Sequence, residues 1–293
     1  MKSKLNKRIS RLLENTADLS LKRKARRILT ELNPKTSDRI LDVGCGDGYY
    51  ILLASQLEKI FGVGLEYDAK NLLAAERNFS NLKIKYKKVT SWEKNIKKGI
   101  YLIEGDIVKM PFEDNFFDKV VMSEVAEHLP DDLAGLKEVY RCMKKEGILL
   151  LTVPNKNYPF LWDPVNWVSE RLLNFHFKSG FLAGIWNQHL RLYSKDEIVS
   201  VVKKAGFKIK ILEVQTRWCL PFNHYLINLG ARLLAGNKLS KQFARQANKF
   251  EHFDVKKRSS LIKLYYALAE FADGFNGCNH PSTGTTIFIK AYK

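Results

Sequence analysis

Short apolar runs alternate with amphipathic segments along most of this 293-residue chain. Runs such as RILDV and EGILLLTVP have the length of buried strands, whereas KDEIVSVVKKAGF repeats its apolar residues at helical spacing. Strands that alternate with helices predict an α/β fold with a parallel sheet covered on both faces. Seven strands are expected, at residues 39–43, 60–66, 99–106, 117–124, 146–154, 208–215 and 285–292.

Three stretches interrupt this alternation. Residues 81–99 are rich in lysine, residues 154–193 are rich in aromatic side chains, and residues 216–284 form a basic, helical insertion before the last strand. The second and third stretches leave from carboxyl ends of strands, where open α/β sheets bind their ligands. The expected organisation is a basic helical arm (1–35), a core (36–215, completed by 285–293) and a capping insertion (216–284).

The N-terminal segment is basic and amphipathic. Leu5, Ile9, Leu12 and Leu13 recur at helical spacing among lysine and arginine residues, and a second basic helix, LKRKARRILTEL, follows. Such helices either lay their apolar face on an anionic lipid surface or cover the protein core with it. The pattern alone does not separate these two possibilities.

Composition narrows the range of partners. The formal net charge of +18 indicates an anionic partner, which is a membrane surface, a nucleic acid or an acidic small molecule; a lysine-biased protein without such a partner is the alternative. No apolar run reaches the roughly 18 residues of a transmembrane helix. The four cysteines have neither zinc-site nor disulfide-framework spacing. We expect a cytoplasmic location, with peripheral contact to a membrane left open.

The stretch LDVGCGDGYY, residues 41–50, contains the clearest candidate ligand-binding motif of the chain. A strand that ends in a glycine-rich turn before a helix is typical of nucleotide binding, because glycine lets a ligand approach the main chain. The spacing is GxGxG rather than the GxGxxG of dinucleotide-binding folds, and Asp42 lies two residues before the first glycine. A carboxylate there suits a ligand with an ammonium group better than a pyrophosphate.

The chain resembles class I S-adenosylmethionine (SAM) methyltransferases, in particular the type 11, ubiquinone-biosynthesis-like group. LDVGCGDG resembles the first motif of that family, and GVGLEYD, EGDIVKMPF and FDKVVMSEVAEHL resemble the next three in the right order. Four ordered motifs are far more specific than one. The resemblance covers residues 36–215 and 285–293 and implies a Rossmann-like sheet of seven strands with the last one antiparallel, SAM as cofactor, and methyl transfer as activity.

The resemblance also implies roles for individual residues. Asp42 would face the ammonium group of SAM, Glu66 would accept hydrogen bonds from both ribose hydroxyls, and Asp106 would face the adenine amino group. The implied cofactor contacts are Asp42, Gly44, Cys45, Gly46, Gly48, Glu66, Tyr67, Asp106, Ile107, Ser123, Glu124 and Val125. The alternative is that the glycines only form a turn and the carboxylates only end strands.

The string SEVAEH supplies the candidate catalytic residues Glu124, Glu127 and His128. It resembles the Glu-x-x-Glu-His pattern of ubiquinone-pathway O-methyltransferases, where that pattern is associated with a divalent metal. Methyl transfer needs mainly positioning, but a hydroxyl acceptor must lose its proton, which a histidine accepts near neutral pH. Mg²⁺ or Mn²⁺ binding by these three residues is an alternative, as is a purely structural helix start; we expect no metal.

The aromatic stretch and the insertion are expected to frame the acceptor. Trp162, Trp167 and Trp186 beside basic, apolar helices suit a membrane interface. The leading hypothesis is therefore O-methylation of a small or amphiphilic acceptor, such as a quinone, a lipid or a lipid-linked glycan; an ordinary cap over a soluble molecule is the alternative.

Two other functions rank below this one. The positive charge favours nucleic-acid methylation, but Ser123-Glu124-Val125 does not resemble the Asn-Pro-Pro-Tyr motif of amino-directed base methyltransferases. A non-catalytic scaffold with a SAM fold comes third. The oligomeric state is open.

Overall fold

The computed structural model describes residues 2–16, 18–93, 96, 98–222, 225, 229, 260–277 and 282–293. Much of the insertion predicted at 216–284 therefore lies outside the described residues, including the apolar segment RWCLPFNHYLINLGARLLAG beyond Phe222, apart from Tyr225 and Leu229, and Cys278. The described strands are β1 (Arg39–Val43), β2 (Phe61–Glu66), β3 (Lys87–Val89), β4 (Ile100–Glu104), β5 (Phe117–Ser123), β6 (Met143–Pro154), β7 (Lys208–Gln215) and β8 (Thr286–Tyr292).

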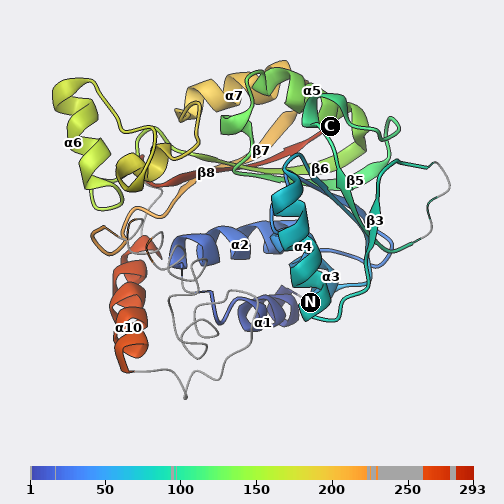
Figure 1. The fold of residues 1–293 in the computed structure, drawn as a ribbon, viewed down its shortest axis with the longest axis horizontal. Helices are drawn as coiled ribbons and strands as arrows, with labels where there is room; N and C mark the ends of the chain where they lie inside the picture. The colour runs from blue at the N-terminus through green and yellow to red at the C-terminus, as the bar shows by residue number, and fades with distance from the viewer. Residues whose placement is uncertain are drawn as a thin grey trace.

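These eight strands form one sheet in the order β3-β4-β2-β1-β5-β6-β8-β7 (Figure 1). All neighbouring pairs are parallel except those of β8, which runs antiparallel to both β6 and β7. The predicted α/β fold with an antiparallel last strand is thus confirmed. The strand that the sequence did not predict is β3, in the lysine-rich stretch; Lys87 and Lys88 are exposed there, so no apolar pattern marks it.

Helices cover both faces of the sheet, and the sheet separates two apolar cores (Figure 1). On one face lie α5 (Asp132–Cys142) and α7 (Lys195–Lys204). On the other lie α1 (Lys2–Leu12), α2 (Leu19–Leu32), α3 (Tyr49–Leu57) and α4 (Ala69–Asn81). The strands feed both cores because successive side chains point to opposite faces: Leu41 joins one cluster and Ile40 the other.

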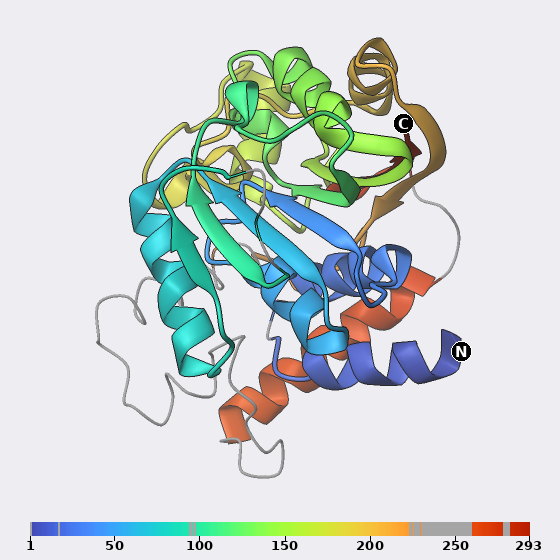
Figure 2. The same ribbon diagram turned by 90° about the vertical axis from the view of Figure 1, so that its right-hand side faces the viewer.

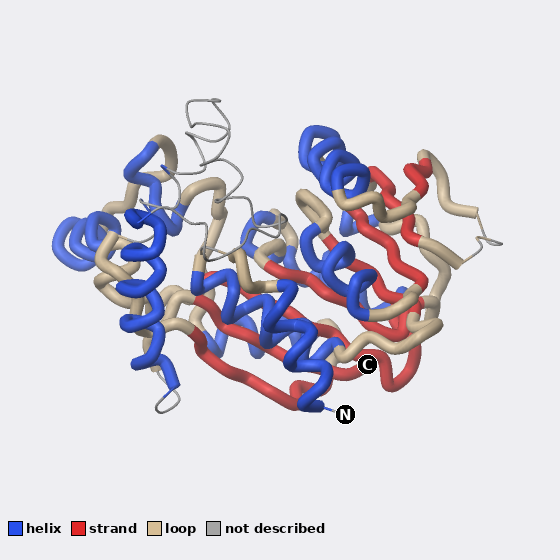
Figure 3. The backbone as a smooth tube through the Cα atoms, turned by 90° about the horizontal axis from the view of Figure 1, so that it is seen from below, coloured by secondary structure: helices blue, strands red, loops and turns tan. Residues whose placement is uncertain are grey.

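The N-terminal helices cover the core with their apolar faces. Ile9, Leu13, Ile28 and Leu29 are completely buried in the same cluster as α3. Asp18 caps α2 by accepting hydrogen bonds from the amides that open the helix. Figure 3, which views the molecule from this side, shows the N-terminal helix lying over the strands. Of the two possibilities for these helices, the structure therefore shows a cover on the core.

The aromatic stretch after β6 folds as a small layer of its own. It contains α6 (Pro164–Leu173) and η3 (Phe181–Trp186), packed around a cluster that includes Tyr158 and Trp162. The fully buried Asp163 holds this layer together, because its carboxylate accepts hydrogen bonds from the amides of Asn166 and Ile185 and from the hydroxyl of Tyr225. We refer to this layer, residues 155–193 at the carboxyl end of β6, as the cap; it is distinct from the insertion at 216–284.

The described part of the insertion before β8 is also helical. It consists of α10 (Ser260–Gly274) and η5 (Phe275–Gly277), and the Asp273 carboxylate accepts from the Arg23 guanidinium of α2 at 2.8 Å. The helices α6 and α10 lie at the same end of the molecule (Figures 1 and 3). None of the described helices combines the length and the apolar content needed to cross a membrane.

Candidate active site

The glycine-rich loop lies between β1 and α3, at the carboxyl edge of the sheet (Figure 2). Gly44, Gly46 and Gly48 all have positive φ, at 63°, 54° and 80°. A Cβ atom built on Gly46 would meet no other atom within 4 Å. The main chain at Gly46 thus combines a backbone conformation that favours glycine with open space in front of it, so a ligand can lie directly against it.

Cys45, between these glycines, contributes to the core. Its side chain is 6% exposed and packs on Gly64 of β2, where an added Cβ would lie 2.9 Å from the Cys45 Sγ. Burial raises the pKa of the Cys45 thiol well above its usual value. The thiol is therefore a buried packing group, and the loop presents its main chain to the open side.

Glu66 joins the end of β2 to the glycine loop. Its Oε2 accepts a hydrogen bond from the Gly46 amide at 2.7 Å, and its Oε1 accepts one from the Asp68 amide at 3.0 Å. Each carboxylate oxygen has two lone pairs, so each retains one for a further donor. This arrangement fits a vicinal diol, such as the ribose of SAM, bound beside Gly46.

Asp42 lies behind the loop, 2% exposed, and its Oδ2 accepts a hydrogen bond from the Ile51 amide at 3.1 Å. Burial, with a smaller contribution from the nearby carboxylates of Glu66 and Asp47, raises the pKa of Asp42 to about 8. A buried carboxyl group with so high a pKa is a good partner for a cation, because a bound ammonium group compensates for the lost hydration of the carboxylate.

The remaining predicted cofactor residues lie at the same edge with different exposure. Asp106 is exposed and accepts from the Val108 amide at 3.0 Å, whereas Ile107 is buried in the core cluster. Tyr67 is 75% exposed. Ser123 hydrogen-bonds Thr152 at 2.8 Å, and Val125 contacts the loop, since a Cβ on Gly44 would lie 2.6 Å from its Cγ2. Their roles toward the cofactor stay predictions.

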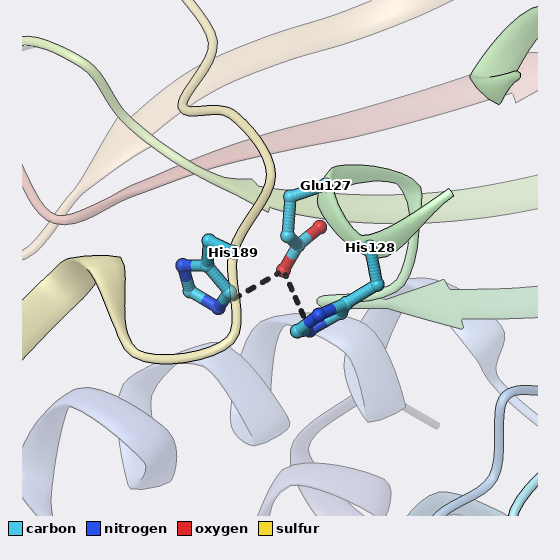
Figure 4. A group of neighbouring side chains, drawn as sticks. All are labelled: Glu127, His128 and His189. Carbon is cyan, nitrogen blue, oxygen red and sulfur yellow. Dashed lines mark ion pairs between the residues drawn. The ribbon is translucent and has the colours of Figure 1, made fainter. Parts of the chain in front are cut away.

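A carboxylate and two imidazoles meet just beyond the end of β5 (Figure 4). The Oε1 atom of Glu127 lies 3.9 Å from His128 Nε2 and 3.8 Å from His189 Nε2. Glu127 is fully buried, and neither of its carboxylate oxygens accepts a hydrogen bond from the described residues. Burial, reinforced by the charge of Glu124, raises its pKa well above the usual value. We call Glu127, His128 and His189 the carboxylate–histidine cluster.

Main-chain contacts of the cap hold this cluster in place. The Gln188 carbonyl accepts from His128 Nδ1 at 2.9 Å, and the Leu190 amide donates to the Glu127 carbonyl at 3.0 Å. Because a carbonyl can only accept, the neutral His128 ring carries its proton on Nδ1, which leaves the lone pair on Nε2. His128 is therefore oriented as a proton acceptor on the side that faces Glu127.

The sequence analysis placed Glu124 in this group and missed His189. Glu124 has a positive φ of 56° and lies 3.4 Å from the Lys24 ammonium of α2, so its carboxylate is paired with that cation. His189 comes from the cap, 61 residues after His128. The one feature of the sequence that could have pointed to His189 is its position at the start of HLRLYSKDE, the segment that precedes the last helix of the core.

The carboxylate–histidine cluster also has the chemistry of a metal site. Its three ligand atoms all lie within 4.8 Å of one another. Imidazole nitrogen and carboxylate oxygen together suit zinc, manganese or iron, and a cation would satisfy the Glu127 oxygens. The same three side chains also suffice for proton transfer without a metal.

Comparison with protein families matches residues 8–211 to the family described as "Methyltransferase domain". The chain is 26% identical over 181 residues to 2-methyl-6-phytyl-1,4-hydroquinone methyltransferase 2 of Oryza sativa subsp. japonica, covering 61% of this chain and 42% of that protein. It is 28% identical over 127 residues to demethylmenaquinone methyltransferase of Staphylococcus saprophyticus, covering 43% and 48%. The matches thus span less than half the length of these relatives.

Solved structures share the fold at lower identity. Phosphoethanolamine N-methyltransferase 2 of Haemonchus contortus, solved with phosphomonomethylethanolamine and S-adenosylhomocysteine, superposes with a TM-score of 0.53 at 21% identity, covering 92% of this chain and 52% of that one. A Bacillus halodurans protein described as a methyltransferase gives 0.51 at 19% identity, covering 92% and 98%. At these identities the likeness establishes the architecture alone.

Proposed function

Because the chain belongs to the family of methyltransferase domains, we propose that it is a SAM-dependent methyltransferase whose acceptor is a hydroquinone or a related phenol with an apolar tail. The observation that carries this proposal is the carboxylate–histidine cluster at the same sheet edge as Gly46 and Glu66. The two relatives named for hydroquinone and menaquinone chemistry support the acceptor class.

The proposed reaction divides the work between two sets of residues. SAM, when bound, supplies a methyl group on a positively charged sulfur, which leaves as a neutral thioether. Glu66 and the loop at Gly46 fix the position of that donor, and positioning is the largest requirement of such a displacement. His128 Nε2 takes the proton of the acceptor hydroxyl. The imidazolium that results favours the ionised form of the adjacent Glu127, which in turn stabilises that cation.

The atom that receives the methyl group follows from the same deprotonation. A phenolate is nucleophilic at oxygen and at the neighbouring ring carbons, so His128 prepares the acceptor for either product. We propose O-methylation, in which a methyl ether forms, S-adenosylhomocysteine leaves and the proton stays on the imidazole until solvent takes it. Methylation of a ring carbon would instead release the proton of that carbon, and the phenolate oxygen would regain a proton, so that the hydroxyl group remains.

The acceptor is testable with one matched set of compounds. The protein is incubated with SAM labelled at the methyl group and with a hydroquinone that carries a short isoprenoid tail. Label is expected in this compound, whereas the corresponding quinone and dimethyl ether, which have no hydroxyl proton, stay unlabelled. Fragmentation of the product by mass spectrometry then distinguishes O- from C-methylation. Labelling of the dimethyl ether, or of none of the three while SAM binds, would contradict the proposed acceptor.

Nucleic-acid methylation has weaker support. A hollow of about 560 Å³ is lined by several lysines, among them Lys83, Lys85, Lys87 and Lys98, and could attract an anionic chain. It lies where β3 and β4 begin, whereas the glycine loop and the carboxylate–histidine cluster lie where strands end. Salt-sensitive binding of transfer RNA, together with labelling of that RNA, would favour this second candidate.

The raised pKa of Asp42 predicts a pH dependence of cofactor binding. An ammonium group binds the ionised carboxyl group better, and at pH 6 a group with a pKa of about 8 is mostly protonated. The affinity for S-adenosylhomocysteine is therefore expected to rise from pH 6 to pH 7.5, by up to about tenfold per unit. Calorimetry of wild type and Asp42→Asn checks this; 5′-methylthioadenosine, which lacks the ammonium group, serves as the control ligand and should show no such rise.

The same residue predicts an opposite effect on stability. The folded-state pKa of Asp42 lies above its ordinary value of 3.8, so the folded protein binds the proton more tightly than the unfolded chain. The contribution of Asp42 to the free energy of unfolding is therefore lost as pH rises from about 4 to about 8. Asp42→Asn, which can still accept from the Ile51 amide, is expected to melt at a higher temperature than wild type at pH 8. Equal melting temperatures at pH 8 would argue against the raised pKa.

A further inference from the structure

The tip of the cap exposes large apolar side chains within one short run. Leu172 and Leu173, the last two residues of α6, are 76% and 73% exposed, and Phe175, which follows the helix, is 51% exposed. Phe181 and Leu182, at the start of η3, are each 41% exposed. Single exposed apolar residues are ordinary, but five within eleven residues form a contiguous patch of the kind that binds a partner.

The charges around this tip are positive. Arg171 and Lys178 are exposed, and Arg171 lies over the Trp167 ring at 3.9 Å from its centroid. The one acidic residue between positions 164 and 182, Glu170, turns inward and accepts hydrogen bonds from the Tyr158 hydroxyl and the Trp186 indole. An anionic surface would therefore meet cations and apolar side chains here without an exposed carboxylate in the same run.

The helix α10 exposes a second set of large apolar side chains. Leu264, Leu268 and Phe271 are exposed by 57%, 49% and 71%, and their spacing of four and three residues places them along one side of the helix. Phe275, at the start of η5, is 54% exposed. The helices α6 and α10 lie at the same end of the molecule, α6 at the level of the sheet and α10 on the side of the N-terminal helices (Figure 1). We refer to these α6–η3 and α10 residues together as the apolar end surface.

We propose that the apolar end surface docks the protein on an anionic lipid membrane, with the leucine and phenylalanine side chains in the acyl boundary and Arg171 and Lys178 at the headgroups. This combination of apolar and basic side chains is that of interfacial membrane proteins. Charge complementarity selects lipid over a second copy of the chain. Two copies related by a twofold axis would place the same cations near each other, in a chain whose net charge is already +18.

The docking surface differs from the one that sequence amphipathicity suggested. The N-terminal helices are basic and amphipathic, but their apolar faces are buried in the core. The cap carries both the exposed tip and His189, so docking would bring the carboxylate–histidine cluster close to the lipid surface. Docking stands independently of the proposed function, and it would give an acceptor with an apolar tail a short path into the site.

Vesicle flotation tests the apolar contribution. Wild type is expected to float with vesicles of phosphatidylglycerol and phosphatidylcholine, and Leu172→Asp with Leu173→Asp is expected to lower the bound fraction at least tenfold. Leu73→Asp with Leu212→Asp is the matched control, because it adds the same two negative charges at leucines that are 45% and 40% exposed on α4 and β7, away from this end. Both variants change surface side chains, and thermal melts confirm that they are folded. Equal loss of binding in the control, or no binding by wild type at low salt, overturns the proposal.

A charge-matched pair separates this surface from the general positive charge. Arg171→Glu with Lys178→Glu and Lys145→Glu with Lys204→Glu change the net charge equally, and all four residues are exposed. Only the first pair is expected to lower binding, by about tenfold. Equal losses of vesicle binding in the two pairs would show that binding depends on the positive charge of the whole molecule, and would overturn the proposed docking surface. Ultracentrifugation tests whether a second copy of the chain binds this surface instead. If wild type forms a dimer that the Leu172/Leu173 variant does not form, and wild type does not bind vesicles, then the partner is a second copy and the proposal is overturned.

Discussion

Replacing His128 by alanine is expected to lower kcat of methyl transfer by about 10²- to 10⁴-fold, the usual contribution of a positioned general base. The proton of the acceptor hydroxyl then has no imidazole to go to, while the residues that hold SAM are unchanged. The dissociation constant for S-adenosylhomocysteine, measured by calorimetry, should therefore equal that of wild type.

Two further variants make this result specific. Gln188→Asn keeps the main-chain carbonyl that orients His128 and changes only a side chain, and asparagine tolerates the positive φ of 66° at that position. It is expected to retain turnover. Glu127→Gln removes the carboxylate beside both imidazoles and is expected to lower kcat with little change in KM. Normal turnover of the His128→Ala variant would remove the general-base role.

The metal alternative gives a different pattern for the same cluster. If the carboxylate–histidine cluster holds a divalent ion, dialysis against a chelator lowers turnover and addition of Mn²⁺ or Zn²⁺ restores it. In that case Glu127→Gln and His189→Ala would also lower the affinity for the ion, measured by calorimetry on the protein alone. Turnover that a chelator leaves intact would support proton transfer by the side chains themselves.

Replacing Glu66 by alanine is expected to weaken SAM binding at least 100-fold. Two hydrogen bonds to a charged carboxylate are worth about 1.5–3 kcal/mol each, and about 1.4 kcal/mol corresponds to a factor of ten. Glu104→Ala is the matched control, because Glu104 pairs with Glu66 across the sheet and is exposed. It should bind SAM as wild type does, in the same calorimetric measurement.

A second ligand separates the proposed diol contact from the structural role of Glu66 in the loop. Glu66 also accepts from the amides of Gly46 and Asp68, so its loss could loosen the loop as a whole. A 3′-deoxy analogue of S-adenosylhomocysteine should bind wild type more weakly than the parent compound, and the Glu66→Ala variant equally with both. If the variant still discriminates between the two ligands, another residue reads the ribose.

The apolar pattern was sufficient for most of the sheet because each central strand is buried on both faces. Leu41 and Ile40, for example, enter opposite core clusters, and both must be apolar. The strand β3 escaped prediction because it is a short edge strand, held by main-chain pairing to β4 while its lysine side chains remain in solvent. Main-chain hydrogen bonds do not depend on the type of side chain, so a strand whose side chains are mostly exposed shows no apolar pattern in the sequence.

The glycine loop could be predicted from the sequence because its conformation depends on a few neighbouring residues. Positive φ at Gly46 and a carboxylate at the end of the next strand are properties of a few consecutive residues, and Glu66 indeed reaches the Gly46 amide. Only part of the carboxylate–histidine cluster could be predicted from the sequence, because one of its residues is distant along the chain. Glu127 and His128 are adjacent, but His189 arrives through the fold of the cap, over a distance in sequence that no local pattern spans.

The amino-acid sequence by itself determined the succession of strands and helices along the chain apart from β3, the glycine loop and the carboxylates at strand ends. Local backbone preferences and period-two burial depend on neighbouring residues. Tertiary structure decided which apolar faces are covered. It buried those of the N-terminal helices, left those of α6 and α10 exposed, and brought His189 to Glu127. Amphipathicity states that a helix has an apolar face; only the packing of distant segments determines whether protein or another partner covers it.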